Sequence, residues 1–186
     1  MLSIEINYDV DTPNPCKYSG WKLYSFSHRH NNFEHPSKFF SYVNALGNVV
    51  PKNIGIDRKL KCNTAFVLSC FQHGPGCTHW SLKNEGHQCP WDTAQIAGML
   101  MWEDDPKNLS KVKETRKKIA RSFLELYSDW CNGECYYYII ENDGETIDSR
   151  EGFIGSEHIL AHLKDEHPEV FKEKIAVSGE AGYILD

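Results

Sequence analysis

The sequence lacks a long hydrophobic run. No stretch approaches the roughly 20 consecutive apolar residues that a membrane-spanning helix needs, so no membrane association is expected. The first residues, Met1–Glu5, include neither a basic segment nor an apolar one, and no signal peptide is expected either. Both absences indicate a soluble, cytoplasmic protein.

The motifs of several common enzyme classes are also missing. The chain has no phosphate-binding loop, no dinucleotide-binding glycine fingerprint and no Gly-x-Ser-x-Gly nucleophile elbow. It has no internal repeat and no heptad array. Its seven cysteines are an odd number with no secretory signal, so we expect reduced thiols rather than a disulfide scaffold.

Charge is spread unevenly along the chain. Residues 134–186 hold 13 acidic and four basic side chains, whereas residues 1–133 hold 13 acidic and 16 basic ones. An acidic C-terminal region repels phosphates, so direct nucleic-acid binding through residues 134–186 is not expected. Such a region suits a basic protein partner, and a solvated acidic surface is the plainer interpretation.

The length and a hydrophobic content of 40% predict a single α+β domain over residues 1–186. We expect a mixed or antiparallel sheet with one long amphipathic helix, about residues 110–131, packed across it. The alternation and composition of the sequence predict strands at 2–8, 21–26, 64–71, 78–82, 95–102 and 135–140. Asp143-Gly144 predicts a hairpin turn, and shorter helices are expected at 36–46, from Ser156 onward, and at 168–177.

The stretch from Cys89 to Gly98 combines a thiol, a proline, an indole, a carboxylate and an amide at the entry to a predicted buried strand. Polar groups beside a core need hydrogen-bond partners. We expect Asp92 and Gln95 to hydrogen-bond the preceding loop and hold its shape. Together with Trp91 they are candidate binding residues.

Six potential metal ligands lie within twenty residues before and inside this stretch. A tetrahedral zinc site takes four Cys or His side chains, and Cys70, His73, Cys77 and His79 are the alternative set here. The spacing is irregular and includes no Cys-x2-Cys pair, so no cofactor is expected and zinc is the alternative. A second alternative is thiol catalysis with Cys89 as nucleophile, His79 or His87 as base, and Asp92 or Gln95 as orienting groups or oxyanion donors.

The order of three motifs resembles a family of small proteins encoded by phages, plasmids and other mobile elements. The family's Cys-Pro-Trp-Asp-Ser-Gly-Gln-Val-Gly signature is similar to the sequence from Cys89 onward, with Thr93-Ala94 in place of Ser-Gly. Its glycine- and tyrosine-containing strand is similar to residues 132–138. Its closing motif resembles residues 148–155, where Arg150-Glu151 replace Cys-Trp. The likeness covers about residues 64–160, and the family has no assigned reaction.

The resemblance implies a mobile-element protein in a bacterial host, and small proteins of this kind often act against host defences. The leading hypothesis is a non-enzymatic counter-defence inhibitor, of the anti-CRISPR or anti-restriction type, that binds a host nuclease or ribonucleoprotein. The acidic region supplies the other candidate binding residues: Glu141, Asp143, Glu145, Asp148 and Glu151. The alternative is a small hydrolase or nucleotide-processing enzyme that uses Asp92 and Gln95 with a nearby Cys or His.

Overall fold

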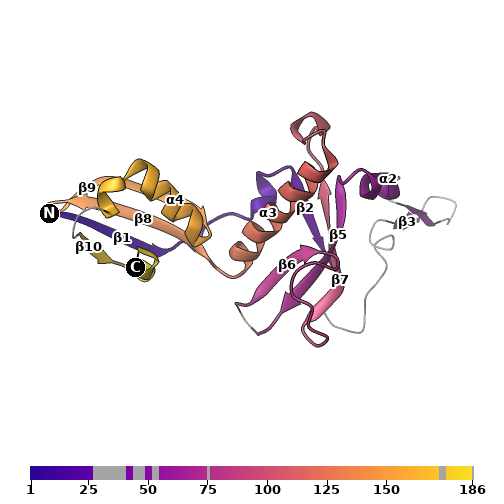
Figure 1. The fold of residues 1–186 in the computed structure, drawn as a ribbon, viewed down its shortest axis with the longest axis horizontal. Helices are drawn as coiled ribbons and strands as arrows, with labels where there is room; N and C mark the ends of the chain where they lie inside the picture. Colours follow the sequence, from indigo (N-terminus) through magenta and orange to yellow (C-terminus); the bar gives the residue numbers. More distant parts are fainter. Residues whose placement is uncertain (27–40, 44–48, 52–54, 75, 172–174, 186) are drawn as a thin grey trace. The chain divides into compact units, whose positions relative to one another are not determined.

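The computed structural model describes residues 1–26, 41–43, 49–51, 55–74, 76–171 and 175–185. Its backbone forms two compact units (Figure 1). Unit 1 comprises residues 1–15 and 129–186, and unit 2 comprises residues 16–128. Unit 2 is thus an insertion in the sequence of unit 1. The expectation that residues 1–186 behave as a single domain stays a prediction.

The expected fold class is confirmed. The structure is α+β, with two four-stranded sheets, one mixed and one antiparallel, and a long helix of 19 residues. A further antiparallel pair joins β3 (Ser41–Val43) to β4 (Val49–Pro51). In the described part of the chain, no helix is long and apolar enough to cross a membrane.

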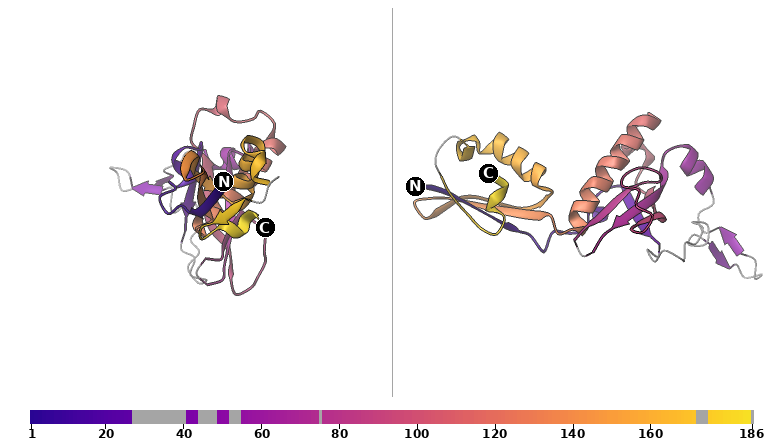
Figure 2. Two further views of the ribbon diagram at one scale, coloured as in Figure 1. Left: turned by 90° about the vertical axis from the view of Figure 1, so that its left-hand side faces the viewer. Right: turned by 60° about the horizontal axis from the view of Figure 1, so that its bottom comes forward.

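Unit 1 is built on a sheet of order β10-β1-β8-β9. Its strands are β1 (Leu2–Tyr8), β8 (Cys135–Asn142), β9 (Glu145–Ile154) and β10 (Ala176–Ser178), and only β10 runs parallel to its neighbour β1. Asp143 and Gly144 both have positive φ (53° and 84°), which confirms the predicted hairpin turn. One face of the sheet packs against α4 (Ser156–Glu166) (Figure 2, right).

Strand alternation defines the core of unit 1. Ile4, Ile6, Tyr138 and Ile140 are fully buried on one face of the sheet, where they pack with Ile159 and Leu163 of α4. The 3-10 turns η3 (Pro168–Phe171) and η4 (Gly182–Leu185) add Val170, Ile184 and Leu185 to this core. The alternate residues of β1 and β8 therefore face away from α4.

Unit 2 contains an antiparallel sheet of order β2-β7-β5-β6. The strands are β2 (Trp21–Ser25), β5 (Ala65–Gln72), β6 (Thr78–Leu82) and β7 (Thr93–Trp102), all within or next to predicted strands. The long helix α3 (Lys113–Cys131) lies against this sheet (Figure 1), because its Ala120, Phe123 and Leu124 share a core with Leu68 and Leu100. A second cluster around Met99 and Met101 includes half-buried residues of α2 (Ile56–Lys61).

Two predicted helices are corrected by the structure. A helix was expected at 36–46, but residues 41–43 form the strand β3. The other residues of that range lie outside the described residues. The helix expected at 168–177 is also wrong, because Pro168 begins only one 3-10 turn and residues 176–178 pair with β1 as β10. Ala176-Val177-Ser178 gains a strand partner there, which outweighs its local helical pattern.

The two units differ strongly in charge. Unit 1 carries 17 acidic and four basic side chains, a formal charge of −13. Unit 2 carries nine acidic and 16 basic side chains, a formal charge of +7. The net charge of −6 is therefore the difference between two oppositely charged units.

Candidate functional site

The loop that leads into β7 is held by the hydroxyl of Thr93. The Cys89 backbone N–H donates to Thr93 Oγ1 at 2.9 Å, and the hydroxyl donates to the His87 carbonyl at 3.0 Å. The Thr93 N–H closes the turn by donating to the Cys89 carbonyl at 3.0 Å. Because Thr93 is buried, these three bonds fix the loop with little competition from water.

Asp92 connects this loop to the end of β5. Its backbone carbonyl accepts from the Gln72 N–H at 2.9 Å. Its carboxylate oxygen Oδ2 lies 2.9 Å from His73 Nδ1 and 3.6 Å from Cys89 Sγ. The expectation that Asp92 braces the neighbouring loop is confirmed, and two of the predicted catalytic residues, Cys89 and Asp92, lie in contact.

The order of these three groups decides what chemistry they can perform. In a thiol-based triad the imidazole lies between the nucleophile and the carboxylate, where it can take the thiol proton. Here the Asp92 carboxylate lies between the thiol of Cys89 and the imidazole of His73. The Asp92 carboxylate can accept a hydrogen bond from the thiol or from the imidazole. The three groups therefore form a polar cluster, in which the thiol and the imidazole are not paired as nucleophile and base.

Three histidines surround the ring of Phe71. The centroid of Phe71 lies 6.4 Å from that of His73, 6.2 Å from that of His79 and 4.5 Å from that of His87. The predicted base His79 therefore stacks beside Phe71, directly opposite it across the β5–β6 pair. No pattern in the sequence marks Phe71 as the centre of this group.

Gln95 and Trp91 occupy different positions from Asp92. Gln95 Nε2 donates to the side chain of Gln88 at 2.6 Å, which confirms that Gln95 hydrogen-bonds the preceding loop. The side chain of Trp91 is 80% exposed at the turn. An exposed indole is a common anchor in protein interfaces, so Trp91 stays a candidate binding residue.

The alternative zinc ligands are divided between the two faces of the sheet. Cys70 is buried in the core of unit 2, whereas the next residue, Phe71, contacts the histidines on the opposite face. Among the residues that the structure describes, no three Cys, His, Asp or Glu side chains gather in a geometry that holds a metal ion. The strand period therefore separates Cys70 from His73 and His79.

In unit 1, residues that alternate with the core form what we call the open face. It consists of side chains of β1, β8 and β9, none of them fully buried: Ser3, Glu5, Asn7, Tyr137, Ile139, Glu141 and Ser149. Asn7 Nδ2 donates to Glu5 Oε1 at 2.7 Å and to the Tyr137 hydroxyl at 3.0 Å. A hollow of about 420 Å³ here is lined by Tyr137, Ile139, Ser149 and Glu151, among others.

The predicted acidic binding residues take three different positions. Glu141 and Glu151 lie on or beside the open face, and Asp143 and Glu145 flank the tip of the β8–β9 hairpin. Asp148 pairs with Ile140 in the register and so belongs to the face that α4 covers. Predicted binding residues thus occur in both units, with Trp91, Asp92 and Gln95 in unit 2.

Asp148 takes part in a polar network that is not visible in the sequence. Its Oδ2 accepts from the Tyr138 hydroxyl at 2.6 Å and lies 2.7 Å from His167 Nε2. The same hydroxyl lies 3.0 Å from His162 Nε2, and His167 Nδ1 lies 3.2 Å from Glu169 Oε1. Five side chains from β8, β9, α4 and the residues that follow it are linked in this way.

The network shifts the titration of two of its members. Burial raises the pKa of Tyr138 well above its usual range, and the hydrogen bond to Asp148 raises it further. The hydrogen bonds from Tyr138 and His167 lower the pKa of Asp148. Asp148 is therefore held as a carboxylate, and Tyr138 as a neutral phenol that donates to it.

No protein family model, no curated protein and no solved structure matches this chain. The functional interpretation therefore depends on the residues and their geometry.

Proposed function

We propose that the protein is a counter-defence inhibitor of phage or mobile-element origin that acts in the bacterial cytoplasm by binding a host nuclease or its ribonucleoprotein. The open face of unit 1, with the adjoining β8–β9 hairpin, is the binding surface in this proposal. The observation that carries it is an aromatic and apolar centre, Tyr137 and Ile139, surrounded by carboxylates on a unit of charge −13.

The composition of this surface suits a basic partner. Tyr and apolar side chains at the centre of an interface supply most of the binding energy, and polar groups at the rim supply specificity. Glu5 lies opposite Ile139, and Glu141 lies two residues further along β8, so both are acidic neighbours of the apolar centre. Glu151 lines the hollow beside Tyr137 and Ile139, together with Arg150, and the three carboxylates form a mainly acidic rim. Nucleases carry basic grooves that hold phosphates, so such a rim accelerates association and makes it sensitive to salt.

The resemblance of residues 64–160 to mobile-element proteins supports the biological setting of the proposal. It contributes no reaction, because the family it points to has none assigned. The Asp148 network contributes stability to the same hairpin, since Tyr138 and His167 hold β9 from the side of α4.

Co-purification with candidate nuclease and Cas complexes tests the proposal, first at low salt and then at high salt. We expect the wild-type protein to form a complex with one of these nucleases. We expect the double variant Glu141→Lys/Glu151→Lys to form none. The matched control is Asp165→Lys/Glu166→Lys, which makes the same charge change at exposed positions of α4 and retains binding. Equal loss of binding in both variants, or no complex with any restriction or Cas component, contradicts the proposal.

The contact of Asp92 with both His73 and Cys89 favours a second candidate function, a small hydrolase or nucleotide-processing enzyme. In that case Asp92→Asn abolishes the biological effect at unchanged thermal stability, because an amide keeps the shape but loses the charge. If Asp92→Asn retains the effect, or loses it only in proportion to lost stability, the enzyme candidate is rejected.

A further inference from the structure

Unit 2 carries a concentration of basic side chains that the proposed function does not use. Residues 106–121 contain seven basic side chains and one acidic side chain, Glu114. The six residues of α2 contain three further basic side chains beside Asp57. These two segments are 45 or more residues apart in the sequence.

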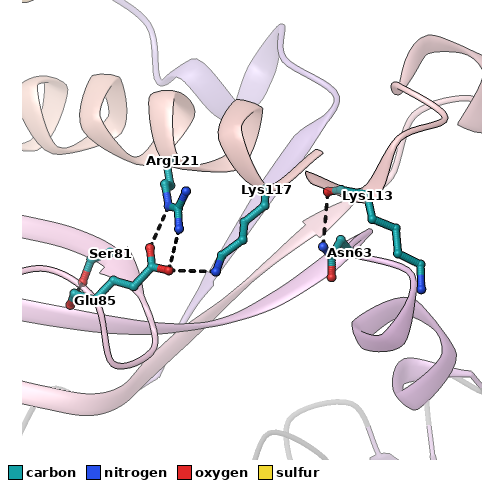
Figure 3. A network of polar contacts seen from close by, with 6 residues as sticks. All are labelled: Asn63, Ser81, Glu85, Lys113, Lys117 and Arg121. Atoms are coloured by element: carbon teal, nitrogen blue, oxygen red, sulfur yellow. Dashed lines mark hydrogen bonds and ion pairs between the residues drawn. The ribbon is translucent and has the colours of Figure 1, made fainter. Parts of the chain in front are cut away.

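The structure brings the two segments together. Arg116 of α3 donates from Nη1 to the Cys62 carbonyl, the C-cap of α2, at 2.7 Å, and from Nε to the Ser110 carbonyl at 2.5 Å. Asn63 Nδ2 donates to the Lys113 carbonyl at 3.2 Å (Figure 3). The start of α3 is thereby fastened to the end of α2.

A third segment joins them at a hollow of about 350 Å³. Its lining includes Leu60 of α2, Asn63, Lys83 after β6, and Lys117 of α3. The exposed cation of Lys83 thus belongs to the same side of unit 2 as the α2–α3 junction. In Figure 3 the Lys113 side chain extends from the start of α3 on the side of α2.

Internal carboxylates neutralise only part of this charge. Glu85 pairs with Lys117 at 2.9 Å and with Arg121 through two bonds of 2.8 Å (Figure 3). The other cations of the three segments form no ion pair with any residue in the described ranges. We call six of them the basic surface: Arg58, Lys59, Lys61, Lys83, Lys111 and Lys113. Asp57 and Glu114 are the acidic residues among them.

We propose that the basic surface binds the phosphate backbone of double-stranded nucleic acid. Lys and Arg side chains without an internal ion pair are available to bind phosphates. Binding is favourable because it releases the counterions condensed on the phosphates. Single-strand binders also need aromatic side chains on which bases stack. Neither α2 nor residues 106–121 contain an aromatic residue, so the surface fits a duplex held through its backbone without base recognition.

This inference is independent of the proposed counter-defence function. It concerns unit 2, which is positively charged, and it needs no host protein. The acidic unit 1 repels phosphates, so binding depends on the basic surface and has a limited affinity at physiological salt.

The test measures binding of the full chain to two 20-base-pair DNA duplexes of unrelated sequence by fluorescence anisotropy over a range of salt concentrations. Six phosphate contacts predict a slope of about −5 for the logarithm of the association constant against that of the salt concentration. We expect Lys111→Gln/Lys113→Gln to reduce the slope by about two for both duplexes. The control Lys17→Gln/Lys164→Gln removes the same charge at exposed positions elsewhere and keeps the slope.

Circular dichroism verifies that both variants fold. An unchanged slope in Lys111→Gln/Lys113→Gln, or an equal loss in the control, overturns the proposal. Two further outcomes also overturn it: binding to vesicles of anionic lipid with none to the duplexes, and salt-sensitive self-association of the chain that replaces duplex binding. The last outcome identifies the acidic unit of a second copy as the occupant.

Discussion

At the scale of single residues, the hydroxyl of Thr93 is the group on which the candidate loop depends. It accepts from the Cys89 N–H and donates to the His87 carbonyl, so it satisfies two backbone groups on either side of the turn. The carboxylate of Asp92 then joins the loop to His73. The buried hydroxyl of Thr93 holds the turn itself, and the carboxylate of Asp92 holds the turn against His73.

We predict that Thr93→Val lowers the free energy of unfolding by about 1–3 kcal/mol. Valine fills the same volume but leaves the Cys89 N–H and the His87 carbonyl without their partner, and an unsatisfied buried group costs about this much. Chemical denaturation measures the change. Thr146→Val, at an exposed position of β9, is the matched control and changes stability by less than about 0.5 kcal/mol. Equal effects at both positions contradict the role of Thr93.

The sequence predicted part of this site. Asp92 and Gln95 were expected to bond the preceding loop, and they do so through His73 and Gln88. Spacing along the chain predicts a metal site that joins Cys70 to His73 and His79. Spacing alone does not show which face of a strand each residue occupies, and Cys70 points into the core on the other face. The Asp148 network was not predicted, because His162, His167 and Asp148 approach only after β8 and β9 pair and α4 folds over them.

At the scale of elements, Glu85 fastens the loop after β6 to α3. It accepts two bonds from the Arg121 guanidinium and one from Lys117, and its backbone carbonyl accepts from the Ser81 hydroxyl at 2.8 Å (Figure 3). The hydrogen bond from Arg121 is the main reason why the pKa of Glu85 falls from 4.5 to about 2. The charged form of Glu85 is thus the form that the folded state stabilises.

We predict that Glu85→Gln lowers stability by about 1 kcal/mol at neutral pH, in the range of partly exposed ion pairs. Because the pKa of Glu85 is lower in the folded state, its contribution is present above pH 4.5 and is lost as the pH falls from 4.5 toward 2. Denaturation at several pH values measures this, and wild type and variant converge at low pH. Glu125→Gln, an exposed position of α3, is the control. A constant difference across the pH range contradicts the assignment.

Most elements were predicted from the sequence, and the exceptions share a cause. Strands β1, β5, β6 and β8 and the long helix α3 have strong period-2 or helical patterns, and the structure has them at the expected places. The segment 176–178 has no period-2 pattern, and its local pattern predicts a helix. It is a strand only because β1 offers a free edge beside it, and a local pattern does not contain that information.

At the scale of the whole molecule, the chain divides into two units with separate cores and opposite charges. We predict that residues 16–128 fold alone and unfold cooperatively, because this segment is continuous and contains its own sheet and most of α3. Circular dichroism and thermal melting of the isolated segment measure this. Failure of the segment to fold supports the single domain expected from the sequence instead.

The position of β1 has a consequence for synthesis on the ribosome. Leu2 pairs with Asn142, and Ile6 with Tyr138, so β1 has no partner strand until residue 142 has emerged. Unit 2 ends at residue 128, shortly before β8 is synthesised, and can fold first. The N-terminal strand therefore spends the longest time of any element without its neighbours. Co-translational folding therefore starts in unit 2, and the open face of unit 1 forms after it.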